Sequence, residues 1–170
     1  MSESRSRSHA PPAGRKGHHM EAAAKVDVAE FAMGDFPAVD RLWRRSGLWM
    51  RPSDDADETR LKLERDPDLF LLARVEGEIV GAVVGGWDGR RAYVYHLAVA
   101  AERRRAGIAS ALMDELERRF REKGALKAKL QILADNHASR AFFQQRGYLL
   151  ERDCEPWGKE LQEGGAPPER

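Results

Sequence analysis

The residues with the clearest chemical potential in this sequence lie in one stretch near its middle, from Leu97 to Ser110. The stretch reads as the end of a strand, a turn that carries Arg104 and Arg105, and a helix that begins with the small residues Gly107 and Ala109. Small side chains leave the free N–H groups of the first helical turn accessible. Those groups and the helix dipole favour an anion, above all a phosphate or pyrophosphate. The stretch therefore predicts a phosphate-binding turn, with an ordinary turn of solvated arginines as the alternative.

Two other phosphate-binding motifs fit this turn less well. A Walker loop needs two glycines at a fixed spacing followed by Lys-Ser or Lys-Thr, and the sequence lacks this combination. The dinucleotide fingerprint needs three glycines, whereas the turn contains only Gly107. Both kinds of nucleotide site are therefore disfavoured here.

A second patterned stretch, Asn136 to Tyr148, follows at a distance that makes the pair more specific than either motif alone. Together the two stretches resemble motifs of the GNAT acyltransferase superfamily. The cofactor motif, Arg/Gln-x-x-Gly-x-Gly/Ala, stands at residues 104–109. The second, Asn-x-x-Ala/Ser-x-x-Phe/Leu-Tyr-x-x-x-Gly-Phe/Tyr, stands at residues 136–148, with one departure. The sequence before the first motif is similar to that of bacterial YpeA-like single-domain acetyltransferases. The resemblance spans roughly residues 28 to 161.

The resemblance implies a mixed α/β fold, the GNAT-like acyl-CoA N-acyltransferase fold, whose mixed, mostly antiparallel sheet of about six to seven strands is flanked by about four helices. It also implies acetyl-coenzyme A as co-substrate, no metal, and direct attack on the thioester by a primary amine. That amine would belong to a protein N-terminus, a lysine or a small molecule. The residues that the resemblance assigns to the cofactor are Leu97, Ala98, Val99, Arg104, Arg105, Ala106, Gly107, Ile108, Ala109, Ser110, Asn136, Ser139 and Phe143.

The same resemblance places the reaction at Tyr95, His96 and Leu97. A bulge in the fourth strand would leave the Leu97 N–H free to polarise the thioester carbonyl. Many relatives carry Glu as a base where this sequence has Tyr95, and the adjacent His96 belongs to the side-chain type that titrates near physiological pH. Because side chains alternate along a strand, Tyr95 and His96 point to opposite faces unless the bulge intervenes. A histidine packed against a helix is the alternative for His96.

Phe143 is the departure from the family pattern, at the residue that would protonate the leaving thiolate. Relatives carry Tyr there, whose phenol can donate a proton, whereas a phenyl ring cannot. Water can relay protons in a direct transfer, so an N-acetyltransferase is the leading prediction. The alternative is a non-catalytic coenzyme A-binding or interaction protein on the same fold. Cys154 has no triad spacing with a histidine, and the histidines form no metal-ligand pattern.

The elements that must position these residues alternate between strands and helices. Turns at residues 76–77 and 87–89 predict an antiparallel meander of three strands. A helix over residues 107–123 predicts a crossover to a parallel strand. The expected strands are residues 26–31, 69–75, 78–84, 92–99, 128–132 and a last strand from Tyr148. The other expected helices begin at Asp35, at Ser53, Asp54 or Asp55, and at Asp135 or Asn136.

Composition limits the remaining possibilities. The chain has 170 residues, 42% apolar and 34% charged, with a net charge of +1, which fits one solvated domain and not an electrostatic nucleic-acid binder. No apolar run is long enough for a membrane span, and one cysteine fits a reducing compartment. We therefore expect a cytoplasmic, bacterial monomer or homodimer without nucleic-acid or membrane partners.

The expected domain is residues 25–163, with disordered tails at residues 1–24 and 164–170. The Ser/Arg-rich N-terminal tail reads as a non-functional extension, a basic arm for an anionic partner, or a targeting peptide.

Overall fold

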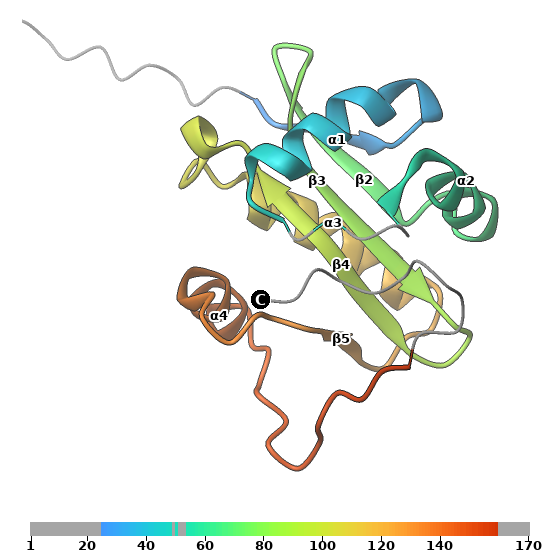
Figure 1. Cartoon of the computed structure of the whole chain (residues 1–170), viewed down its shortest axis with the longest axis vertical. Helices are drawn as coiled ribbons and strands as arrows, with labels where there is room; N and C mark the ends of the chain where they lie inside the picture. Colours follow the sequence, from blue (N-terminus) through green and yellow to red (C-terminus); the bar gives the residue numbers. More distant parts are fainter. Residues whose placement is uncertain (1–24, 49, 51–53, 160–170) are drawn as a thin grey trace, which may run out of the picture.

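The computed structural model describes residues 25–48, 50 and 54–159, and in this part of the chain it shows a five-stranded mixed sheet with helices on both faces (Figure 1). The strands follow one another in sequence order across the sheet. The first four pair antiparallel, and the fifth pairs parallel with the fourth. The strands are β1 (Asp27–Glu30), β2 (Phe70–Val75), β3 (Glu78–Trp87), β4 (Ala92–Val99) and β5 (Ala128–Leu130). The helices are α1 (Phe36–Arg45), α2 (Ala56–Arg65), α3 (Ile108–Glu122) and α4 (His137–Gln145), with 3₁₀ turns η1 (Met33–Asp35) and η3 (Ala101–Arg103).

The helices begin where the sequence supplies start signals. Pro37 lies in the first turn of α1, where a missing N–H leaves no internal hydrogen bond unmade. The Asp55 side chain accepts the N–H groups of Asp57 and Glu58, both at 2.9 Å, at the start of α2. Gly47, at φ +73°, follows the end of α1. The predicted boundaries of these helices are therefore confirmed to within about one residue.

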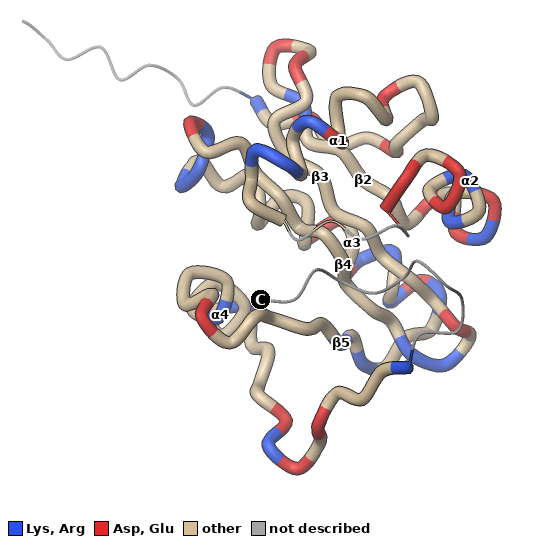
Figure 2. The backbone as a smooth tube through the Cα atoms, viewed as in Figure 1, with Lys and Arg blue, Asp and Glu red and all other residues tan. Residues whose placement is uncertain are grey.

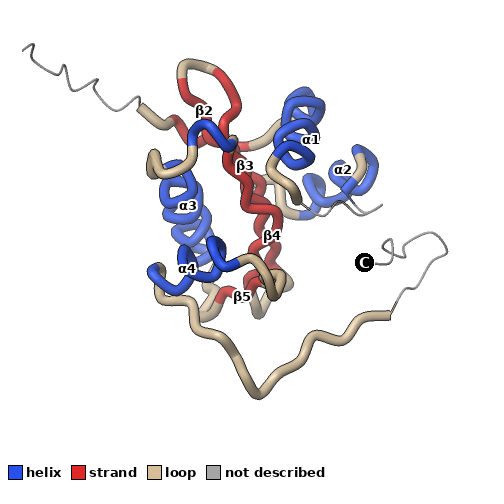
Figure 3. The backbone as a smooth tube through the Cα atoms, turned by 60° about the vertical axis from the view of Figure 1, so that its left-hand side comes forward, coloured by secondary structure: helices blue, strands red, loops and turns tan. Residues whose placement is uncertain are grey.

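The sheet separates two hydrophobic clusters, one under α1 and one under α3 (Figure 3). Helices α1 and α2 cover one face, and α3 and α4 cover the other. The cluster under α1 includes Phe31, Val39, Leu42, Trp43, Phe70, Leu72, Ala82, Val84 and Ala98. The cluster under α3 includes Leu69, Leu71, Val80, Val83, Val94, Ile108, Leu112, Leu116, Phe120 and Phe143.

Two glycines allow α3 to lie directly on β3. A Cβ atom at Gly81 would lie 2.8 Å from the Ile108 side chain. One at Gly85 would lie 2.6 Å from the Leu116 side chain and 2.9 Å from that of Phe120. Core atoms do not approach this closely, so a larger residue at either position would push the helix away. This contact fixes where the N-terminus of α3 lies relative to the end of β4.

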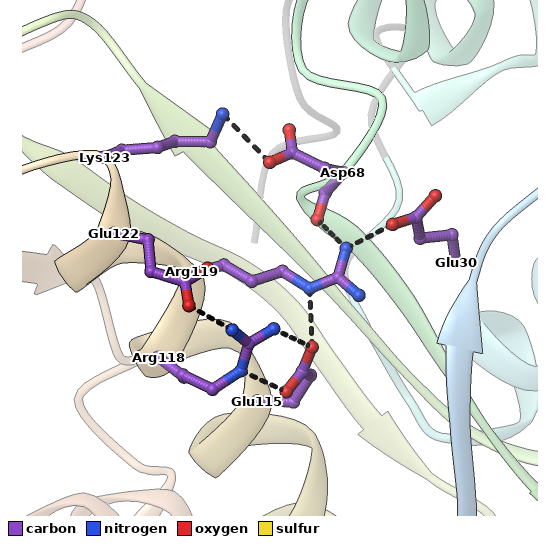
Figure 4. Close-up of polar contacts among 7 residues, drawn as sticks. All are labelled: Glu30, Asp68, Glu115, Arg118, Arg119, Glu122 and Lys123. Atoms are coloured by element: carbon purple, nitrogen blue, oxygen red, sulfur yellow. Dashed lines mark hydrogen bonds and ion pairs between the residues drawn. The ribbon is translucent and has the colours of Figure 1, made fainter.

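An ion-pair network holds the other end of α3 against the sheet (Figure 4). The Arg119 guanidinium bonds to Glu115 at 2.7 Å, to Glu30 of β1 at 2.5 Å and to the Asp68 carbonyl oxygen at 2.7 Å. Arg118 bonds to both oxygens of Glu115, and this contact above all lowers the pKa of the Glu115 carboxyl to about 2. Because Arg119 is mostly buried, the network joins α3 to β1 and to the segment before β2.

The chain after α4 does not form the predicted last strand. None of the described residues 148–159 is in a strand, so the sheet has five strands where the resemblance implied six to seven. Leu149 is 86% exposed, and Glu151 pairs with Lys127 and Lys129 beside β5. Glu151 thus joins this segment to β5 through side-chain ion pairs, because β5 ends at Leu130 and the described residues form no backbone ladder beyond it.

The predicted tails, residues 1–24 and 164–170, lie outside the described residues. Within the described residues, no helix combines the length and apolar character needed to cross a membrane.

Candidate active site

Strand β4 contains a β-bulge at the residues predicted to carry the reaction. The register between β3 and β4 shifts by one residue between Ala82 and Val84, which leaves Val83 opposite both His96 and Leu97. His96 has φ +46°, a left-handed backbone conformation that costs a non-glycine residue about 1–2 kcal/mol. The bulge that the family resemblance implied is therefore present, and its extra residue is His96 or Leu97.

The bulge turns Tyr95 and His96 toward the same face of the sheet. Tyr95 pairs with Val84, whose side chain lies in the cluster under α1. The His96 ring meets the Trp43 ring of α1 edge-on, with centroids 5.1 Å apart. Leu97 packs instead against the cluster under α3. The simple alternation that would separate Tyr95 from His96 is thus interrupted, and His96 does pack against a helix.

His96 also contacts Asp54, a residue that the sequence indicated only as a possible helix cap. The distance between His96 Nε2 and Asp54 Oδ1 is 2.6 Å, and the two side chains are 24% and 12% exposed. Asp55 is the residue that caps α2. No sequence signal joins two residues that lie 42 positions apart.

A cavity of about 390 Å³ adjoins Asp54, between α1 and the start of α2. Its wall combines apolar and charged side chains, and Asp40 and Arg44 within it bond to each other at 2.9 Å. Acidic residues gather at this end of α2 in Figure 2. The wall includes Phe36, Asp40, Arg44, Met50, Asp54 and Asp55.

Tyr95 stacks on Tyr93, with ring centroids 6.1 Å apart. Its ring rests on Gly86 of β3, where a Cβ would approach the ring to 3.1 Å. Burial raises the pKa of Tyr95 above its ordinary value of 10.0. The phenol is therefore protonated at neutral pH and does not supply a base there.

Strands β4 and β5 pair only over their first three residues. Ala92 to Val94 pair with Ala128 to Leu130, and no described strand pairs with residues 95–99 on that side (Figure 1). Leu97, Ala98 and Val99, which were predicted to contact the pantetheine, lie on this edge. An unpaired strand edge offers its N–H and C=O groups to an extended ligand.

The turn between β4 and α3 keeps its backbone donors free. Outside helices and strands, no backbone hydrogen bond of the described residues uses the N–H groups of residues 105–110 as donors. Ala111 is the first to donate, to the Gly107 carbonyl at 3.0 Å. Gly107 and Arg105 adopt left-handed φ angles of +78° and +65°, and a Cβ at Gly107 would meet no atom within 4 Å. The backbone of this turn is thus open to a ligand.

Positive charge lies at the same turn, in Arg103, Arg104 and Arg105, next to Glu102 (Figure 2). Arg104, Arg105 and Ala106 are exposed, whereas the Ile108 side chain is buried and anchors the first turn of α3. The Arg104 side chain reaches back to the Val99 carbonyl at 3.5 Å. Free backbone donors, a helix N-terminus and arginines together fit the diphosphate of a coenzyme A molecule.

Helix α4 carries Asn136, Ser139 and Phe143. Asn136 is the N-cap, and its Oδ1 accepts the Ser139 N–H at 3.0 Å. Phe143 is only 6% exposed and packs between Phe142 and Tyr148, each with ring centroids 5.2 Å away. Asn136 is thus a capping residue at least, and the Phe143 ring belongs to the hydrophobic core.

Tyr148 does not replace the phenol that is absent at Phe143. Its hydroxyl donates to Glu117 of α3 at 3.3 Å. Burial and the Glu117 carboxylate raise the pKa of Tyr148 to about 12. Tyr148 was expected to pack in a last strand; it packs against α3 and Phe143 without one.

The comparison with known families agrees with these features. The profile described as "Acetyltransferase (GNAT) family" matches residues 36–148, which contain the bulge, the turn and α4. The chain belongs to this family. Two GNAT relatives are acetyltransferases of Pectobacterium atrosepticum and Sodalis glossinidius, 41% and 37% identical over 137 residues. Each alignment covers 80% of this chain and 96% of the relative.

Solved GNAT structures share the fold. Ard1 from Thermoplasma volcanium is 26% identical with a TM-score of 0.67, over 74% of this chain and 84% of that one. The ribosomal-protein-alanine N-acetyltransferase of Brucella melitensis is 25% identical with a TM-score of 0.61, over 81% and 100%. The PaiA N-acetyltransferase of Thermoplasma acidophilum in complex with coenzyme A is 18% identical with a TM-score of 0.68, over 75% and 91%, a likeness of fold.

Family membership makes this protein an N-acetyltransferase, and it supports acetyl-coenzyme A as the co-substrate. The prediction of an enzyme on a mixed α/β GNAT fold is confirmed. Within the described residues, no group of three or more His, Cys, Asp or Glu side chains is placed to hold a metal ion.

Proposed function

We propose that this protein transfers the acetyl group of acetyl-coenzyme A to a primary amine, which attacks the thioester directly. The observation that carries the proposal is the unpaired edge of β4 at residues 95–99, which leads into the turn with free donors at residues 105–110. The pantetheine would lie along the edge and the diphosphate on the turn, where Arg104 and Arg105 add positive charge. Acetyl-coenzyme A supplies an acetyl group that is already activated as a thioester.

Leu97 and His96, the two residues of the bulge, would act on different reactants. The Leu97 N–H, at the unpaired edge, would donate to the thioester carbonyl oxygen and polarise it. An alkyl amine has an ordinary pKa of about 10, so it must lose a proton to attack at neutral pH. His96 would accept that proton, since its ring lies on the face of the sheet that carries α1 and belongs to the side-chain type that titrates near physiological pH.

The departing sulfur receives no proton from Phe143 or Tyr148. The Phe143 ring has no donor, and the Tyr148 hydroxyl is engaged with Glu117. A free thiol has a pKa of about 8.5, so a thiolate released near neutral pH takes a proton from water. The absence of a phenol at position 143 therefore lowers the efficiency of the reaction without preventing it.

The acceptor is a protein N-terminus, a lysine or a small molecule. Two structural neighbours at 25% identity support two of these classes: a ribosomal-protein-alanine N-acetyltransferase and an aminoglycoside acetyltransferase from a soil metagenomic sample. The acetyl acceptor would approach from the face of the sheet that carries α1 and α2, where His96 and Tyr95 lie.

The test is thiol release from acetyl-coenzyme A by the full chain, measured with a chromogenic disulfide. The acceptors are a peptide with N-terminal alanine, an N-blocked lysine peptide and the aminoglycoside sisomicin. We expect turnover with one class and a loss of about 10²-fold or more in kcat for His96→Ala. Coenzyme A binding without turnover for any amine would contradict the proposal and favour a binding protein. Unchanged turnover in His96→Ala would contradict the role of the imidazole.

A further inference from the structure

Asp54 has a carboxylate that the start of α2 does not need. The cap of α2 is Asp55, which accepts two backbone N–H groups. Asp54 instead directs Oδ1 to His96 Nε2 at 2.6 Å, across 42 residues of sequence. With only 12% of its side chain exposed, this carboxylate is largely withdrawn from water. A mostly buried charge requires a compensating partner, and the imidazole ring provides one.

The His96 ring is held from three directions. The bulge fixes its backbone at φ +46°, the Trp43 ring meets it edge-on, and Asp54 bonds to the nitrogen farthest from the backbone. Strained backbone of this kind concentrates at functional sites, where the surrounding structure enforces it. A ring fixed in this way presents one nitrogen in a constant direction.

The hydrogen bond also decides which nitrogen is basic. A carboxylate only accepts hydrogen bonds, so the neutral His96 ring carries its proton on Nε2 and its lone pair on Nδ1. Nδ1 is the ring nitrogen nearer to the β4 backbone. The next residue along the strand is Leu97, in the part of β4 that no described strand pairs on the β5 side.

We infer that Asp54 is a positioning residue that holds His96 in the Nε2–H tautomer, so that Nδ1 accepts the proton of the acceptor amine; this inference rests on the proposed function. In the transfer, the amine lone pair forms the C–N bond with the acetyl carbon and the C–S bond breaks, with its electron pair going to sulfur. The amine proton moves to His96 Nδ1. The Asp54 carboxylate keeps its hydrogen bond to Nε2 and stabilises the imidazolium that results.

The first arm of the test is independent of turnover. Side-chain ¹⁵N NMR of the full chain reports the tautomer of each histidine, and His96→Gln identifies the His96 signals among the five histidines. We expect the Nε2–H tautomer in the wild type and a mixture of tautomers in Asp54→Asn, whose amide both donates and accepts. Asp55→Asn removes the same charge one residue away and keeps a good helix cap, so it should leave the His96 tautomer unchanged.

The second arm measures turnover of acetyl-coenzyme A with the best amine from the panel. Asp54→Asn should lower kcat by about 10²-fold while the KM for acetyl-coenzyme A stays within about twofold. In the His96→Gln background the same substitution should cause no further loss, because Asp54 acts through the imidazole. An equal loss in both backgrounds would assign Asp54 a purely structural role and overturn the inference. An Nδ1–H tautomer in the wild type, or an unchanged spectrum in Asp54→Asn, would also overturn it. No turnover with any amine would instead remove the proposed function, and this role with it, even if the NMR result is as expected.

Discussion

Replacement of Gly107 by aspartate tests the phosphate-binding turn sharply, because protein stability and cofactor affinity should change in opposite directions. Gly107 precedes α3 at φ +78°, and a Cβ there would meet no atom within 4 Å. Asn and Asp tolerate left-handed backbone better than other non-glycine residues. Gly107→Asn is the matched control, because its side chain has the shape of aspartate without the charge.

The size of each effect follows from the position of the residue. A carboxylate at a helix N-terminus stabilises the helix by about 0.3–1 kcal/mol, so Gly107→Asp should have a Tm equal to or above that of Gly107→Asn. Two unit charges about 5 Å apart in water repel each other by about 0.8 kcal/mol. A diphosphate carries two such charges, so the repulsion is about 1.7 kcal/mol, or roughly 15- to 20-fold in Kd. Any exclusion of water from the turn enlarges this difference.

Calorimetric titration with coenzyme A gives the Kd of each variant, and thermal circular dichroism gives its Tm. We expect Gly107→Asp to bind at least about 10-fold more weakly than Gly107→Asn, with a difference that shrinks as salt is added. The same Kd in both variants would show that no phosphate lies near Gly107 and would refute the assignment of the turn. A lower Tm in Gly107→Asp would refute the argument from the helix dipole.

Three further predictions concern the scaffold. Gly85→Ala should lower the free energy of unfolding in urea by about 1–3 kcal/mol, because the new methyl group overlaps α3. Gly34→Ala meets open space and should change it by less than about 0.5 kcal/mol, so equal effects would contradict the close contact. Arg119→Ala should lower it by about 1–3 kcal/mol, against about 0–1 kcal/mol for Arg60→Ala in an exposed pair; similar losses would speak against the network. The pKa of Glu115, lowered to about 2, means that its carboxylate stabilises the fold above the ordinary value of 4.5 and loses this effect as pH falls toward 2. The Tm of Glu115→Gln should therefore fall less than that of the wild type between about pH 5 and 2, and parallel curves would disprove the shift.

Local sequence patterns predicted most of the helices and strands, because the backbone conformation of each segment depends mainly on residues within that segment. Glu76 and Gly77 both adopt positive φ, +52° and +83°, as a two-residue hairpin turn between β2 and β3 requires. The helix predicted over residues 107–123 is α3, Ile108–Glu122. The phosphate-binding turn likewise carries its signal in adjacent residues, since small side chains and arginines occur where a strand gives way to a helix.

The remaining features depend on residues that are distant in sequence. Asp54 lies just before a helix, where an aspartate is expected as a capping residue. The sequence therefore contains no indication of its contact with His96. The sequence of β4 likewise contains no signal of an inserted residue, and the bulge was expected only from the family resemblance. The predicted last strand is wrong because Tyr148 and the leucines after it have strand-like side chains, whereas β5 offers only three residues with which a further strand could pair. The early end of β5 at Leu130 is a property of the assembled sheet.

The bulge has a consequence for how such a site can arise. On one side of it Ala82 pairs with Ala98, and on the other Val84 pairs with Tyr95. If His96 were deleted, Leu97 alone would stand opposite Val83, and the two halves of the hairpin would share one uninterrupted ladder. Every other side chain of β4 would keep the face that it now occupies. His96 can thus be regarded as the inserted residue of β4, and a strand with this imidazole differs from a regular strand by one inserted residue.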